Sequence, residues 1–171
     1  MLLALPPGIA RVSYTTTSDV EPNPHAANSD PVANLAGNGG KCPVETQPAG
    51  SGVAVYTSSP IATGATVIGA TEVTAQFSAS PGASGVELNG RLYDVFPDGK
   101  AVMVDRGPRR VSDAEALSGS VSFELHGNGW RFPPGHRIRI ELAQDDDPFL
   151  KASSVPSTLT LTGVDLAIPI R

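Results

Sequence analysis

The sequence has 171 residues with 17 acidic and 12 basic side chains, which gives a formal net charge of −5. That length suits one domain with its own hydrophobic core. An acidic chain is a poor partner for nucleic acid or for an anionic membrane surface, so we expect neither. No apolar run approaches the roughly 20 residues that a membrane span needs. The apolar start, Met1–Leu5, is too short for a signal peptide and no basic residue precedes it, so the compartment stays open.

Metal and cofactor chemistry find little support in the sequence. Cys42 is the only cysteine, which excludes an intramolecular disulfide and a site built from several cysteines. His25, His126 and His136 lie in no spacing typical of metal ligands, and we expect them to be structural hydrogen-bonding residues. We expect Asp145–Asp147 to form a solvated acidic loop rather than a calcium site. The sequence therefore predicts no bound metal and no cofactor.

A serine nucleophile is equally hard to find. The nucleophile elbow of α/β-hydrolases needs Gly-x-Ser-x-Gly between a strand and a helix. Ala49–Gly52 and Leu117–Ser120 lack that spacing, and no strand–elbow–helix pattern surrounds them. We therefore assign no catalytic residue to this chain.

The first 50 residues are weakly patterned. Val12–Thr16 is a candidate strand, but residues 18–50 are dominated by Pro, Asn, Gly, Ser, Asp and Ala. A loop of that length is uncommon inside a compact domain. The sequence therefore predicts an irregular arm or linker over residues 1–50 and a separate domain over residues 51–171.

From Gly52 onward, short alternating segments are separated by turn residues. Gly90 interrupts the apolar face of one segment, which indicates a bulge or close packing. A weaker strand candidate lies near Thr66–Ile68, and Ser112–Leu117 is predicted to form one helical turn. Strands of this length and spacing, each with one apolar face, predict two antiparallel sheets packed as an all-β sandwich. The eight main strand candidates are residues 53–57, 72–79, 86–96, 101–105, 120–126, 136–143, 158–162 and 165–168.

Two turns organise the predicted sandwich. The strand that ends at Phe96 runs into Pro97-Asp98-Gly99, where Pro presets φ, Asp tolerates a left-handed conformation and Gly adopts positive φ. A strand from Ala101 follows, so the sequence predicts a hairpin. The second turn, Pro133–Gly135, leads into the alternating strand that begins at His136.

Basic and aromatic residues offer two candidate binding groups. The arginines are expected to pair across strands with Glu87, Glu124 or Glu141, and a site for a carboxylate or a neighbouring domain is the alternative. Trp130 is expected to pack at the edge of the core, and a sugar-stacking platform is its alternative role. Trp130 and Arg139 are therefore the candidate ligand-binding residues. The arginines concerned are Arg106, Arg109, Arg110, Arg131, Arg137 and Arg139.

These motifs carry a family resemblance. Residues 92–99 resemble the Asp-Val and Pro-Asp-Gly hairpin in the C-terminal non-catalytic domain of X-Pro dipeptidyl-peptidases and cocaine-esterase-like serine hydrolases of the acyl esterase family. Residues 135–140 resemble the Gly-His-Arg strand of that domain. In matching order, Tyr56–Ile61 resembles its opening strand, Arg109–Arg110 its arginine after the hairpin, and residues 146–148 its acidic-Pro stretch. The resemblance covers about residues 53–171.

The resemblance implies a jelly-roll β-sandwich of the galactose-binding-like type. In the family this domain packs on an α/β-hydrolase domain that carries a Ser-Asp-His triad, and it shapes one wall of a site for X-Pro dipeptides or esters. The catalytic domain would belong to the same polypeptide or to a partner chain, and residues 1–50 would be the tail that leads out of it. None of the triad maps onto this chain, because the surroundings of His25 do not match those of the family's catalytic histidine.

The residues that match the family motifs are expected to be structural rather than catalytic. They are Asp94, Pro97, Asp98, Gly99, Gly135, His136 and Arg137. An independent carbohydrate-binding module on the same fold is the alternative function, and exposed aromatic side chains would favour it. A complete small esterase would need a nucleophile that no motif reveals. Homo-oligomerisation is left open.

Overall fold

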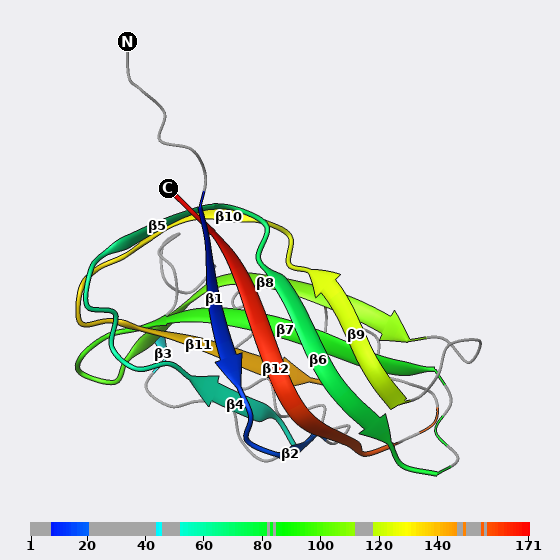
Figure 1. Cartoon of the computed structure of the whole chain (residues 1–171). Helices are drawn as coiled ribbons and strands as arrows, with labels where there is room; N and C mark the ends of the chain where they lie inside the picture. Colours follow the sequence, from blue (N-terminus) through cyan, green and yellow to red (C-terminus); the bar gives the residue numbers. More distant parts are fainter. Residues whose placement is uncertain are drawn as a thin grey trace.

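The computed structural model describes residues 8–20, 44–45, 52–81, 83, 85–111, 118–146, 149, 155 and 157–171. Within these ranges the chain forms strands and turns and no helix, so none of these residues belongs to a helix that could cross a membrane. Two antiparallel sheets pack face to face (Figure 1). This confirms the β-sandwich predicted from the alternating pattern. The strands are β1 (Gly8–Tyr14), β2 (Ser18–Val20), β3 (Val44–Glu45), β4 (Ala54–Thr57), β5 (Ala65–Gly69), β6 (Glu72–Ala79), β7 (Val86–Val95), β8 (Ala101–Val111), β9 (Ser118–Glu124), β10 (Asn128–Phe132), β11 (Arg137–Ala143) and β12 (Leu159–Ile170).

The seven-stranded sheet is organised around β12, its longest strand. Leu159 pairs with Val20 of β2 and with Ala79 of β6, so these two strands flank β12 on opposite sides. β1 pairs with the second half of β12 on the β2 side. On the other side β6 pairs with β9, and the β5–β10 pair continues the sheet beyond the end of β6. Figure 1 shows β5 and β10 curving over that end of the sandwich.

The five-stranded sheet has the order β3-β8-β7-β11-β4. Its centre is the predicted hairpin, in which β7 and β8 pair from Val86↔Val111 to Val95↔Ala101. One register shift interrupts the pairing between Leu92 and Tyr93. The first hairpin strand matches the predicted one to within a residue, whereas β8 is longer than predicted because pairing continues through the charged residues that follow Val104.

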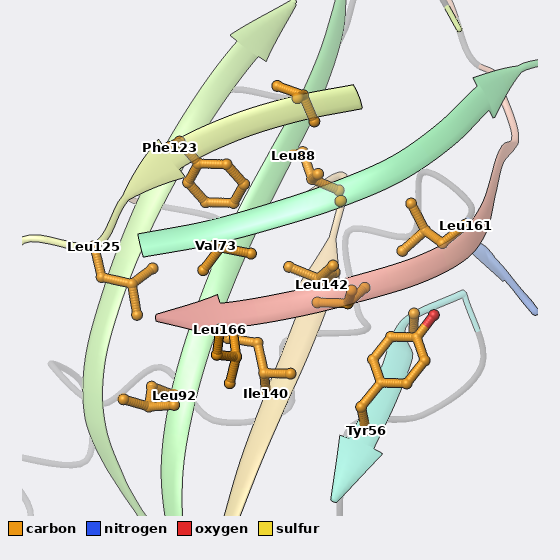
Figure 2. Packing of buried hydrophobic residues seen from close by; sticks show 14 of the residues in the cluster. Tyr56, Val73, Leu88, Leu92, Phe123, Leu125, Ile140, Leu142, Leu161 and Leu166 are labelled. Atoms are coloured by element: carbon orange, nitrogen blue, oxygen red, sulfur yellow. The ribbon is translucent and has the colours of Figure 1, made fainter. Parts of the chain in front are cut away.

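The core lies between the two sheets. Inward residues alternate along each strand, as in β6, where every second side chain is buried. Full burial of one large aliphatic side chain stabilises a fold by about 1.5–3 kcal/mol, so this layer supplies most of the favourable free energy. Figure 2 shows aromatic and aliphatic side chains from both sheets in contact in this layer, including Tyr56, Val73, Leu88, Leu92, Phe123, Leu125, Ile140, Leu142, Leu161 and Leu166.

Two glycines allow the sheets to approach closely. A Cβ atom on Gly90 would lie 3.0 Å from Leu125 Cδ2, and one on Gly107 would lie 2.7 Å from the backbone of both Glu124 and Leu125. The β7–β8 pair therefore packs directly against the end of β9, with Gly107 against the backbone and Gly90 against the Leu125 side chain. Of the two interpretations of Gly90, close packing is confirmed, and the register shift lies two residues further on.

The N-terminal part differs from the predicted arm. β1 and β2 belong to the seven-stranded sheet, and β3 pairs with β8. The sandwich therefore includes strands from the first 50 residues, although their role as a tail of another domain stays a prediction. Two predicted C-terminal strands are one strand, β12, with a register shift between Leu161 and Gly163. The predicted strand near Thr66–Ile68 is confirmed as β5, and the helical turn over residues 112–117 lies outside the described residues.

Candidate functional site

The carboxylate of Asp94 joins the two motif segments and Trp130 of β10 at one end of the sandwich. Asp94 is the ninth residue of β7 and is only 2% exposed. Its Oδ2 accepts a hydrogen bond from Trp130 Nε1 at 3.1 Å, and its Oδ1 lies 2.8 Å from Nδ1 of His136. The His136 ring also contacts the ring of Phe96, with centroids 5.2 Å apart. Residues predicted separately as structural or ligand-binding thus form one cluster.

The hairpin turn next to this cluster has the predicted geometry. Gly99 adopts a φ of 87°, the left-handed region that glycine tolerates best. Phe96 and Lys100 close the turn through a backbone hydrogen bond of 2.7 Å. Asp98 is exposed, and its carboxylate accepts a hydrogen bond from the Lys100 backbone N–H and pairs with Lys100 Nζ at 3.0 Å. The hydrogen bond to the Lys100 side chain, with that to its backbone, lowers the pKa of Asp98.

The second motif turn lies against the first. Gly135 has a φ of 84°, and a Cβ atom added there would lie 3.9 Å from Pro97 Cγ. Its N–H donates to the carbonyl of Ile61, whose own N–H donates to the carbonyl of His136. Arg137 is exposed and donates to the carbonyl of Ser58 at 3.1 Å. The turns therefore hold each other and the loop after β4 in place.

A second polar cluster lies on the outer face of the five-stranded sheet. Arg91 Nη2 donates to Glu141 Oε2 at 2.9 Å, and Arg106 Nη1 donates to Asp146 Oδ2 at 3.0 Å. Asn89 also donates to Asp146. Arg91 and Glu141 are no more than 1% exposed, so the ion pair between them is removed from water. Aromatic rings complete the cluster, with Phe149 3.9 Å from the guanidinium carbon of Arg106.

Several charges of this cluster differ from the expected arrangement. Arg139 pairs at 3.0 Å with Glu141, one of the expected partners, but the two residues lie on the same strand, whereas Glu87 pairs with Arg110 across β7 and β8 as expected. The expected solvated loop is wrong for Asp145 and Asp146, which are 5% and 2% exposed.

The sequence did not predict burial of these charges because polar residues alternate along β7 and β11 just as they do on a strand whose outer face is exposed to water. Glu87, Asn89 and Arg91 follow every second position of β7, yet all ten residues of that strand are buried. The alternation reports which residues face away from the core, but it does not report what covers that outer face. The sequence feature that could have predicted the buried network is the dense set of alternating charges of both signs on neighbouring strands.

Trp130 and Arg139, the candidate ligand-binding residues, lie in different places. Trp130 is half-buried, packs against the core and donates its indole N–H to Asp94. Arg139 is 3% exposed, and its guanidinium carbon lies 4.3 Å from the centre of the Tyr93 ring. A ligand-binding role for either residue stays a prediction, but the structure does not bring the two together.

These clusters have little catalytic potential. The His136–Asp94 pair has the carboxylate and imidazole of a triad, but no described serine or cysteine side chain hydrogen-bonds the ring. Among the residues that the structure describes, no group of three His, Cys, Asp or Glu side chains is placed to hold a metal ion. The polar side chains bond to one another and to turns, so the arrangement positions loops and strands.

Fold and site together define a β-sandwich module whose described polar clusters hold turns and strands in place. The chain belongs to the family of X-Pro dipeptidyl-peptidase C-terminal non-catalytic domains, whose family model matches residues 9–167. This membership confirms the resemblance seen in the two motif turns. No curated protein sequence matches the chain significantly.

Solved structures share this fold at low sequence identity. An aminopeptidase from a marine sediment Thaumarchaeota archaeon superposes with a TM-score of 0.65 at 16% identity, over 92% of this chain and 33% of its own. A CocE/NonD family hydrolase from Staphylococcus aureus gives 0.64 at 11% identity, over 97% and 37%. An α-amino acid ester hydrolase gives 0.54 at 20% identity, over 70% and 25%. The chain thus spans about a quarter to a third of the length of these proteins.

Proposed function

We propose that this chain serves a serine hydrolase of the X-Pro dipeptidyl-peptidase or acyl-esterase type as its non-catalytic C-terminal sandwich. In this role it packs on an α/β-hydrolase catalytic domain and shapes one wall of the substrate site. The observation that carries the proposal is the Asp94–His136 pair, which joins the two family motif turns at one end of the sandwich. A rigid end of this kind suits a domain that must present a fixed surface to a neighbouring domain.

Two further observations support the proposal. The described polar clusters bond among themselves and include no nucleophile paired with a base. The similar structures are named as an aminopeptidase and as hydrolases, and the sandwich accounts for only 25–37% of their chains. A catalytic portion outside the matched region is therefore part of the proposal.

Hydrolysis by the purified chain tests the proposal. The substrates are an X-Pro-nitroanilide and a short acyl ester, each tested at several concentrations of the purified chain. We expect no turnover above the buffer rate. Turnover that scales with the chain concentration and survives purification by a second method would overturn the non-catalytic assignment.

A further inference from the structure

Along one side of the sandwich, the edge strands of the two sheets are in contact at one end and leave a groove between them at the other. On this side β1 is the outermost strand of the seven-stranded sheet, and β4 is the outermost strand of the five-stranded sheet. The rings of Tyr14 and Tyr56 lie 5.3 Å apart, and Tyr56 Oη donates to the carbonyl of Thr16 at 3.3 Å. These contacts join the two edges near the end of β1.

An apolar groove of about 280 Å³ occupies the open part. The side chains of β1 that point into it, Ala10 and Val12, are only half-buried, although they face the core layer. Its only polar lining residues in the described part of the chain are Ser58 and Ser59. The apolar lining comes from both sheets and includes Ala10, Val12, Ile61, Val67, Ile138 and Ile170.

Apolar side chains also lie exposed on the opposite face of the sheet. Ile9 of β1 is 64% exposed, and Ile68 of β5, on the other side of β12, is 49% exposed. Ile9 pairs with Pro169 of β12, and a Cβ atom on Gly69 would lie 3.3 Å from that proline ring. The edge therefore presents apolar surface on both faces, which a small molecule bound in the groove alone would not cover.

The backbone and charge of β1 complete the surface. In the described part of the chain β1 pairs with β12 alone, so its second edge offers main-chain donors and acceptors to another strand. Arg11 points outward from the middle of β1, opposite Ala167, and is exposed. Among the described residues Arg11 has no carboxylate within ion-pair distance. A strand added here would bring its own side chain opposite this arginine.

We propose that the free edge of β1 and the adjacent groove bind an extended segment that adds to the seven-stranded sheet. The segment carries aliphatic residues at alternate positions toward the groove and a carboxylate toward Arg11. Strand addition uses main-chain hydrogen bonds for affinity and alternate side chains for specificity. Assigning the segment to the hydrolase portion of a larger protein rests on the proposed function, whereas the surface itself follows from the geometry above.

The test uses the whole chain and a labelled peptide, Ac-Val-Thr-Val-Glu-Val-Thr-Val-NH2. Fluorescence anisotropy measures binding, and hydrogen exchange locates it. We expect saturable binding, slower exchange of amides in β1, and at least tenfold weaker binding by Arg11→Glu. The same peptide with Lys in place of Glu should bind Arg11→Glu better than the original chain. Arg131→Glu, an equal charge change on the exposed face of β10, is the control that should leave affinity unchanged.

Val12→Asp tests the groove and should abolish binding of both peptides, with circular dichroism to show that the fold persists. Three results would each overturn the proposal: no saturable binding, an affinity insensitive to the charge exchange at Arg11, or protection confined to another strand. Concentration-dependent dimers that Arg11→Glu disrupts would also overturn it, because a second copy would then occupy the edge. The proposed function is tested by the hydrolysis assay and strand addition by peptide binding. Either proposal can therefore fail while the other holds.

Discussion

The carboxylate of Asp94 lies 2.8 Å from Nδ1 of His136, 42 residues further along the chain. This contact explains why the Asp-Val and Gly-His-Arg motifs occur together: the first supplies a buried carboxylate and the second supplies the partly buried histidine that pairs with it. Trp130 is held by the same carboxylate at 3.1 Å. The pair fixes the end of β7 against the start of β11 and thereby the two motif turns beside it.

Replacing Asp94 by Ala should therefore destabilise the fold by about 2–4 kcal/mol, because the half-buried side chains of Trp130 and His136 both lose their hydrogen-bond partner. Urea unfolding followed by tryptophan fluorescence measures the change. Asp98→Ala, which removes an exposed carboxylate from the adjacent turn, should cost at most about 1 kcal/mol. Equal losses for the two variants would contradict the role given to Asp94.

Breaking the buried pair between Arg91 and Glu141 should be more damaging than breaking an exposed one. Arg91→Met leaves the Glu141 carboxylate buried with one partner fewer, and we expect a loss of about 3–5 kcal/mol. The double variant Arg91→Met, Glu141→Leu should recover part of that loss, since the buried Glu141 carboxylate is removed together with its partner, and Arg139 and Asp146 each lose only one of their contacts. Lys100→Ala is the exposed control and should change stability by less than about 1 kcal/mol. A double variant less stable than Arg91→Met would refute this explanation.

Gly107 should tolerate no side chain. A Cβ atom there would lie 2.7 Å from the carbonyl oxygen of Glu124, so Gly107→Ala requires β8 or β9 to shift, at a cost of about 1–3 kcal/mol or more. Gly129→Ala is a matched control on β10, because nothing lies within 4 Å of its Cβ position and its φ is not positive. Thermal unfolding of both variants checks the difference. Similar melting temperatures would show that the sheets do not meet at Gly107.

Stability should fall at high pH because of Tyr14. Burial raises the pKa of Tyr14 from 10.0 to about 12, so the folded chain holds this proton more tightly than the unfolded chain. The associated stabilisation is complete below pH 10 and is lost as the pH rises from 10 to 12. Urea midpoints measured across this range should fall less steeply for Tyr14→Phe. Burial also raises the pKa of Tyr56, so Tyr14→Phe, Tyr56→Phe should give a still flatter profile.

Local chemistry explains which parts of the fold could be predicted. The Pro97-Asp98-Gly99 turn carries its conformation in three residues, and the glycine adopts the positive φ that the turn needs. Alternation likewise identified β6 and the inward face of β11. A strand was predicted over Val12–Thr16, but β2 and the place of β1 in the sheet escaped prediction because their partner, β12, lies at the far end of the chain. Isolated short strands with polar neighbours give no signal of so distant a partner.

The candidate site was predicted in pieces. Asp94, His136 and Trp130 were each identified by residue type or motif, but only the pairing of β7 with β11, and the contact of Trp130 from the other sheet, bring them together. The buried network around Asp146 was missed, since a run of aspartates has the composition of a solvated loop. Such a run becomes buried only where arginines from neighbouring strands, here Arg91 and Arg106, provide partners.

Intact-mass analysis after treatment with a serine-reactive fluorophosphonate tests the central claim most directly. A known serine hydrolase serves as the positive control, and the heat-denatured chain shows non-specific labelling. We expect the folded chain to keep its unmodified mass at reagent concentrations that label the control completely. A stoichiometric adduct on one serine of the folded chain, absent after denaturation, would reveal a catalytic nucleophile and contradict the assignment as a non-catalytic domain.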